Sequence, residues 1–142
     1  MEETNRIEEK LSEIKSYVKE IDDRIPPSFE RYKSADVMVK RTLERNLQLI
    51  NDAEIDILAL LTKLKDIGIA SSEENLIDRF NGILSAKVLS HLKRLRRLRN
   101  TLTHAYKNEH YDESVFNAAK NLSEVLAFVK EVSRATATNH RL

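Results

Sequence analysis

The stretch ADVMVKRTLERNLQLINDAEIDILALLTKLKD, residues 35–66, contains no glycine or proline and decides the fold class. Apolar side chains recur in it every three or four residues, which places them on one face of a long α-helix. This stripe consists of Val39, Leu43, Leu47, Ile50, Ala53, Ile57, Leu61 and Leu64. Further apolar residues at positions 49, 55, 58 and 60 widen the face, so we expect the helix to pack against neighbours on more than one side.

A similar stripe precedes this helix. Apolar residues spaced three and four apart over residues 7–25 predict a first helix. Pro26 and Pro27 end it, because proline lacks an amide hydrogen and restricts the residue before it. On the other side of the long helix, Gly68 is predicted to serve as its C-terminal cap.

Three more helices are expected in the second half of the chain. They cover residues 72–84, 85–106 and 112–132. The sequence SSEE at 71–74 contains a capping box for the first of them. Asp112 is predicted to be the N-cap of the last one, and the polar tail 136–142 is predicted to be frayed.

The predicted fold is therefore an all-α, up-and-down helical bundle of about five helices in a single domain, residues 1–142. The chain has no cysteine, which excludes disulfides and thiolate chemistry. No apolar run approaches the roughly 20 residues that a membrane span needs. The N-terminus lacks the apolar core of a signal peptide, so we expect a cytoplasmic protein.

One segment is strongly basic although the whole chain carries a net charge of only +1. Residues 85–108 contain no acidic side chain. Their basic residues are Lys87, Lys93, Arg94, Arg96, Arg97, Arg99 and Lys107. Such a segment is typical of a partner that carries phosphates, but a merely solvated charged face is the more common explanation.

The end of the fourth predicted helix, residues 99–106, carries the candidate chemistry. Asn100 and His104 are four residues apart, so they lie next to each other on the helix and point away from its leucine stripe. Arg99 and Thr103 lie between these two faces. The polar pair is therefore expected to be presented outward.

These residue types could cleave RNA without a metal ion. The 2′-hydroxyl of the RNA would attack the adjacent phosphorus while His104, whose ordinary pKa lies near neutrality, transfers a proton. Arg99 would stabilise the charge that develops on the phosphate, and Asn100 would orient the phosphate or the imidazole. From spacing alone, however, a structural or solvated histidine is the better interpretation.

The pattern Arg99-Asn100-x-Leu102-x-His104-x-Tyr106 resembles the Arg-x4-His-x-Tyr signature of HepT-like ribonuclease toxins in the HEPN superfamily. The long second helix, the break at Gly68 and the short acidic third helix also follow the layout of that family. Two features depart from it: the run before Arg99 is unusually basic, and no glycine precedes the motif.

The resemblance implies a homodimer with a metal-independent endoribonuclease site where the two motifs meet, and no cofactor. Arg99 and His104 would be catalytic, while Asn100, Thr103 and Arg96 would support them or bind RNA. It further implies the toxin of a toxin–antitoxin module, of type II or VII. Its partner would be a minimal nucleotidyltransferase antitoxin that silences the toxin by adding AMP to Tyr106.

Two other functions stay open at this point. The chain could be a non-catalytic helical binding subunit, or scaffold, for a nucleotidyltransferase. It could also be a plain dimeric bundle in which the spacing of Arg99 and His104 is accidental. In each case Leu89 and Leu92, beside the polar face, are expected to contribute to a homodimer contact.

The remaining candidates have structural interpretations. His91 falls on the core side of the fourth helix and is expected to be packed or hydrogen-bonded there. His110 is expected to be a solvated loop residue, and Tyr111 is the competitor of Tyr106 as a modification site. Asp56 lies in an apolar run, so we expect it to pair with a basic residue or to face the dimer partner.

Overall fold

The computed structural model describes residues 2–103 and 110–140, and in these ranges it contains helices and no β-strand. The predicted all-α class is therefore confirmed. The helices are α1 (Glu2–Arg24), α2 (Phe29–Lys33), α3 (Val37–Leu64), α4 (Glu73–Asp78), α5 (Ala86–Thr103), α6 (Tyr111–Lys120) and α7 (Ser123–His140).

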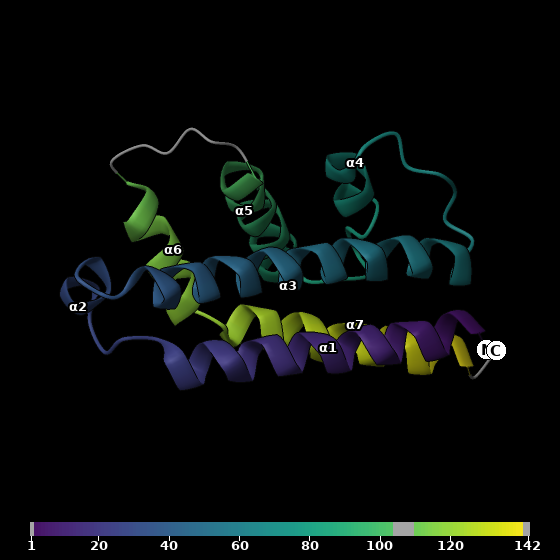
Figure 1. Ribbon diagram of the computed structural model, residues 1–142. Coiled ribbons are helices and arrows are strands. Elements are labelled where there is room, and N and C mark those ends of the chain that lie inside the picture. Colours follow the sequence, from purple (N-terminus) through teal and green to yellow (C-terminus); the bar gives the residue numbers. More distant parts are fainter. Residues whose placement is uncertain (1, 104–109, 141–142) are drawn as a thin grey trace.

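Helices α1, α3 and α7 form the body of the molecule (Figure 1). Helix α1 lies along both α3 and α7 and runs antiparallel to them, and the start of α1 and the end of α7 lie at the same end of the body. Helices α4 and α5 lie on the side of α3 that faces away from α1, with α5 set at an angle to α3, while α6 crosses α3 from that side toward the start of α7. The apolar stripe of α3 is thus covered from more than one side, as its width predicted.

The described residues form seven helices, so the prediction of about five was wrong in two places. The first is α2, which follows the two prolines. The Ser28 side chain accepts a hydrogen bond from the Arg31 amide at 3.2 Å and caps this helix, and Tyr32 is fully buried. Five residues are too few to show a helical period, which explains why the pattern did not reveal the helix.

The second place is the break between α6 and α7 at Asn121, where the backbone leaves the helical region (φ −111°, ψ 56°). The Asn121 side-chain amide donates to the Asn117 carbonyl at 2.8 Å, a bond that competes with helix continuation. The apolar residues Ala119, Leu122 and Val125 keep their spacing of three across the break, so periodicity alone could not detect it.

Two predicted caps were also wrong. Helix α6 begins at Tyr111, with His110 at the N-cap and no side-chain cap bond, while Asp112 pairs with Lys40 at 3.4 Å instead. At the end of α3 the left-handed residue that directly follows the C-cap Lys65 is Asp66 (φ 54°), and Gly68, which also has a positive φ (97°), lies two residues further on. The Ile67 amide there donates to the Thr62 carbonyl at 3.0 Å, as in a Schellman motif.

The other boundaries shift in both directions. Helix α4 ends at Asp78 and not at residue 84. Helix α7 extends to His140, whereas the tail was predicted to fray from residue 136. Thr136 is buried, and its hydroxyl donates to the Val132 carbonyl at 2.9 Å. The predicted end of the fourth helix, at residue 106, lies outside the described residues.

Candidate functional site

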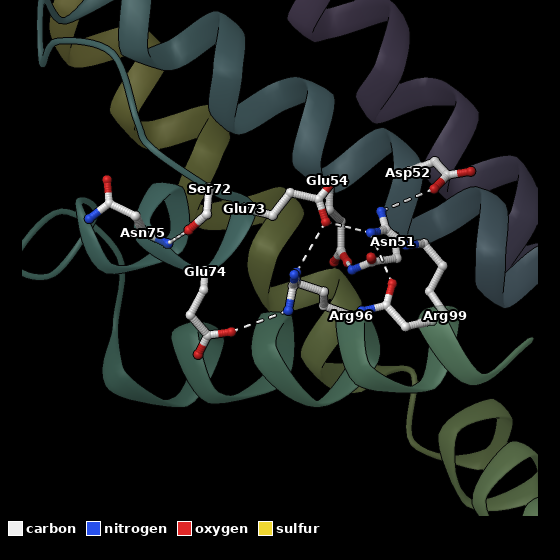
Figure 2. A network of polar contacts seen from close by, with 10 residues as sticks. Asn51, Asp52, Glu54, Ser72, Glu73, Glu74, Asn75, Arg96 and Arg99 are labelled. Carbon is white, nitrogen blue, oxygen red and sulfur yellow. Dashed lines mark hydrogen bonds and ion pairs between the residues drawn. The ribbon is translucent and has the colours of Figure 1, made fainter. Parts of the chain in front are cut away.

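The polar face of α5 is built by residues that recur every three or four positions. Arg96, Arg99, Asn100 and Thr103 share this face, since side chains at these spacings lie above one another on a helix. The start of α5 is fixed by Ser85, whose hydroxyl accepts a hydrogen bond from the Val88 amide at 3.2 Å. The polar face lies against α4, below α3, as Figure 2 shows.

Arg99 is held by side chains from three helices (Figure 2). Its Nη1 donates to Asp52 Oδ1 on α3 at 3.3 Å. Its Nη2 donates to Glu73 Oε1 on α4 and, at 3.3 Å, to Asn100 Oδ1 on α5 itself. The Arg99 side chain, which the sequence placed between the polar face and the leucine stripe, is only 13% exposed and is largely enclosed by these partners.

Arg96 joins the same network one turn earlier. Its Nε lies 3.1 Å from Glu73 Oε1, and its Nη1 lies 3.3 Å from Glu74 Oε2. Glu73 therefore bridges the two arginines. Partial burial acts to raise the pKa of Glu73, but the hydrogen bonds and charges of Arg99 and Arg96 outweigh it and lower that pKa.

The rest of the basic segment is paired in the same way. Lys93 Nζ lies 2.6 Å from Asp78 Oδ1, and Arg94 Nη2 lies 2.7 Å from Glu124 Oε2. The segment is thus not an open cationic surface, because carboxylates from other helices neutralise most of it. Within the part of the chain that the structure describes, Lys87 and Arg97 are exposed and have no ion pair.

The sequence prediction missed these carboxylates. Asp52, Glu73 and Glu74 are 22 to 47 residues away from the arginines that they contact. The acidic start of α4 was visible in the sequence, but as a helix cap and not as a partner of α5. The signal that could have predicted these ion pairs was the opposite charge of α4 and α5, two successive helices joined by a short connection.

The structure tests only part of the predicted catalytic set. It brings Arg99, Asn100 and Arg96 together on one face. Thr103 is exposed, and its hydroxyl donates to the Asn100 carbonyl at 2.9 Å. His104 and Tyr106 lie outside the described residues.

A second polar contact lies deeper, between α3 and α5. His91 Nε2 is 2.7 Å from Glu54 Oε2, and both side chains are buried, Glu54 completely. Burial acts to lower the pKa of His91, but the charge and hydrogen bond of Glu54 outweigh it and raise that pKa. The structural role predicted for His91 is confirmed, whereas the sequence prediction missed its partner Glu54.

Other predicted residues have clear positions. Leu92 is fully buried in the core of its own chain, so its predicted place in a dimer contact was wrong, and Leu89 is half-buried against that core. Asp56 pairs with Lys10 at 3.3 Å, as one of the two expectations had it. Tyr111 is 6% exposed, and burial together with Glu44 raises the pKa of its hydroxyl.

The predicted solvent exposure of His110 is confirmed. Its side chain is 71% exposed, and its Nδ1 lies 3.9 Å from Glu113 Oε2. No helix in residues 2–103 and 110–140 combines the length and apolarity of a membrane span. The same residues include no group of three or more histidine and acidic side chains placed to hold a metal ion.

The fold is that of HEPN toxins. One similar solved structure is a tri-AMPylated Shewanella oneidensis HEPN toxin in complex with an MNT antitoxin, with 23% identity and a TM-score of 0.80. The match covers 91% of this chain and 97% of that one. A mutant of the MntA–HpeT toxin–antitoxin matches at 22% identity and a TM-score of 0.81, covering 92% of this chain and 98% of that one.

A toxin–antitoxin solved with AMP-PNP matches with 21% identity and a TM-score of 0.80, covering 92% of this chain and 98% of that one. No curated protein sequence matches the chain. The family model described as "Ribonuclease HepT-like" matches residues 7–132. The chain therefore belongs to the HepT-like family.

Proposed function

We propose that this protein is a metal-independent endoribonuclease and acts as the toxin of a toxin–antitoxin module. The observation that carries the proposal is the match to the ribonuclease HepT-like family over residues 7–132, a range that includes Arg99, His104 and Tyr106. Arg99 and His104 are the catalytic pair of the proposal. Asn100, which contacts the Arg99 guanidinium at 3.3 Å, supports that pair.

The proposed reaction needs no group beyond the side chains and the RNA itself. The 2′-oxygen of one ribose attacks the adjacent phosphorus and the bond to the 5′-oxygen of the next nucleotide breaks, which leaves a cyclic phosphate. The proton of the 2′-hydroxyl passes by way of the His104 imidazole to the 5′-oxygen that leaves, and Arg99 stabilises the negative charge that builds up on the phosphate oxygens.

The carboxylates around Arg99 set a condition on this mechanism. A guanidinium has five N–H donors, so Arg99 can bind a phosphate while it keeps part of its contact with Asp52 and Glu73. The two carboxylates also repel the same phosphate. The RNA phosphate must therefore compete with Asp52 and Glu73 for Arg99. Until RNA binds, these two carboxylates keep the guanidinium oriented.

A homodimer and an antitoxin complete the proposal. The cleft would form where the motifs of two copies meet. The partner would be a nucleotidyltransferase, since the similar HEPN toxin from Shewanella oneidensis is AMPylated and was solved with an MNT antitoxin. Tyr106 is the proposed acceptor of AMP, and Tyr111 is a poor alternative because it is buried.

A second candidate function is a non-catalytic binding subunit of that nucleotidyltransferase. The engagement of Arg99 with two carboxylates favours this alternative, because it leaves the Arg99 side chain only 13% exposed in the single chain. The two candidates share the partner and Tyr106. Only the first requires His104 to cut RNA.

A strand-scission assay on bulk RNA in the presence of EDTA separates the candidates. We expect the purified wild-type protein to cut RNA and His104→Ala and Arg99→Ala to lose at least 100-fold in rate, the usual size of a lost acid–base or charge-stabilising group. Lys87→Ala is the matched control, since this exposed lysine lies on the same helix without an ion pair among the described residues. Full activity in His104→Ala, or none in the wild type, would reject the catalytic proposal.

A further inference from the structure

A cavity of about 450 Å³ opens on the side of α5 away from Arg99. Residues of α5, α6 and the start of α7 surround it, and Leu47 of α3 also lines it. Its volume lies within the range of 300–1,000 Å³ that is common for small-ligand sites. Nothing in the proposed cleavage reaction uses this space.

The cavity has an apolar floor and a polar rim. The buried side chains Leu47, Leu95 and Val125 form the floor. Ser114, Asn117 and Asn121 line the opening from the α6 side, and all three are exposed. An apolar slot bordered by hydroxyl and amide groups suits a flat heterocycle whose edge carries donors and acceptors.

The charges around the opening also favour a ligand with a phosphate. Arg97 lines the cavity, is exposed, and has no ion pair within the described part of the chain, in contrast to Arg96 and Arg99 on the opposite face. The nearby carboxylate of Glu124 is neutralised by Arg94 at 2.7 Å. Arg97 thus lies beside the cavity and can take a phosphate there without breaking a bond to a described carboxylate.

We propose that this cavity binds one nucleotide of an RNA strand, and the inference rests on the proposed ribonuclease function. The base lies against the leucine floor, with Asn117 and Asn121 at its edge, and Arg97 contacts the phosphate. Single-stranded RNA is recognised in this way, by an unstacked base in a pocket and hydrogen bonds to its edge. A strand held here passes over the C-terminal turns of α5, which also carry Arg99 and Asn100.

The experiment measures binding and not cleavage, so that the two proposals can fail separately. The probes are a short single-stranded oligonucleotide with 2′-O-methyl groups, which cannot be cut through the 2′-oxygen, and the four nucleoside monophosphates. Affinity is measured by fluorescence anisotropy, and the binding site is located by the shifts of backbone amide signals in NMR spectra. We expect shifts at Ser114, Asn117 and Asn121 with the oligonucleotide.

Three variants test the cavity. Ala118→Phe fills it from α6, where the alanine is half-buried, and Asn117→Ala removes an exposed amide without a risk to folding. Each should weaken oligonucleotide binding about tenfold, the effect of one lost base contact. Arg97→Ala should reduce the slope of log affinity against log salt concentration by about 0.7, which is the contribution of one phosphate contact to a single strand. Lys87→Ala removes the same charge away from the cavity and should leave the amide shifts in place.

Each result supports or overturns the assignment. Unchanged affinity in Asn117→Ala and in a folded Ala118→Phe protein would overturn it, as would amide shifts confined to other helices. Monophosphates that bind more tightly than the oligonucleotide would show a site for free nucleotides instead of RNA. A protein that binds the oligonucleotide here but never cuts unmodified RNA would support the assignment of the cavity and reject the ribonuclease proposal. Cleavage of RNA by a protein that does not bind the oligonucleotide here would support the ribonuclease proposal and overturn the assignment of the cavity.

Discussion

Arg99 Nη1 on α5 lies 3.3 Å from Asp52 Oδ1 on α3, so the proposed catalytic arginine is tied to the longest helix of the fold. Glu73 on α4 accepts a hydrogen bond from Nη2 of the same guanidinium. A phosphate that approaches Arg99 meets both carboxylates. The acidic residues around the site should therefore control how strongly RNA binds.

The first prediction concerns Glu73. Glu73→Gln keeps an oxygen that can accept from Arg99 and Arg96 but removes the negative charge that repels phosphate. Affinity for a non-cleavable oligonucleotide should rise about three- to fivefold, the size expected for one partly exposed charge. Fluorescence anisotropy measures the change. Glu9→Gln on the far helix α1 makes the same change of net charge and is the control.

If Glu9→Gln raises the affinity as much as Glu73→Gln does, the effect comes from net charge and not from the contact with Arg99. A weaker affinity in Glu73→Gln would show that the carboxylate serves chiefly to orient the arginine.

The second prediction is a dependence of stability on pH. The arginines lower the pKa of Glu73 below its ordinary value of 4.5, so its ion pairs stabilise the folded state above that pH. This stabilisation is lost as the pH falls through the lowered pKa. Glu73→Gln should therefore unfold about 2 °C below the wild type at pH 7 and together with it in strong acid. Thermal unfolding followed by circular dichroism tests this, and a constant difference at all pH values would contradict it.

The third prediction concerns the buried pair of His91 and Glu54, 2.7 Å apart. His91→Ala leaves the fully buried Glu54 carboxylate without its main partner. The free energy of unfolding should fall by about 3–5 kcal/mol, as for other broken buried ion pairs. Glu54→Leu together with His91→Leu removes both groups and should recover much of this loss. Urea unfolding monitored by circular dichroism measures both variants.

The pH dependence of this pair has the opposite sign to that of Glu73. Glu54 raises the pKa of His91 above its ordinary value of 6.5, so the ion pair contributes its full stabilisation below that pH. The contribution is lost as the pH rises through the raised pKa. The difference between wild type and His91→Ala should therefore shrink at alkaline pH. A difference that grows there would show that neutral His91 is the favoured form.

The fourth prediction is a homodimer in solution. The proposed cleft needs the motif of a second copy, although Leu92 is not available for the contact. Sedimentation velocity at micromolar concentration should give about twice the 16.4 kDa of one chain. The mass of a single chain would contradict the prediction, and with it the idea of a shared cleft.

The sequence predicted the helices α1 and α3 and the polar face of α5 better than it predicted the side-chain contacts between helices. The apolar stripes over residues 7–25 and 39–64 predicted α1 and α3, while the five-residue α2 was too short to show a period. The partners of Arg99 were missed because ion pairs between distant helices leave no periodic pattern. His91 was placed correctly because its position relative to the leucines of α5 decides its burial.

The last prediction concerns control by the partner. The nucleotidyltransferase partner, supplied with ATP and a divalent metal ion, should add AMP to Tyr106 and stop RNA cleavage. An added phosphate and nucleotide near the basic end of α5 would compete with RNA for the same cations. Mass spectrometry of proteolytic peptides locates the modification. Tyr106→Phe should remain unmodified and active in the presence of the partner, whereas Tyr111→Phe, at a buried position, should be modified like the wild type. AMP on Tyr111, or inhibition of the Tyr106→Phe protein by binding alone, would show that the antitoxin acts in another way.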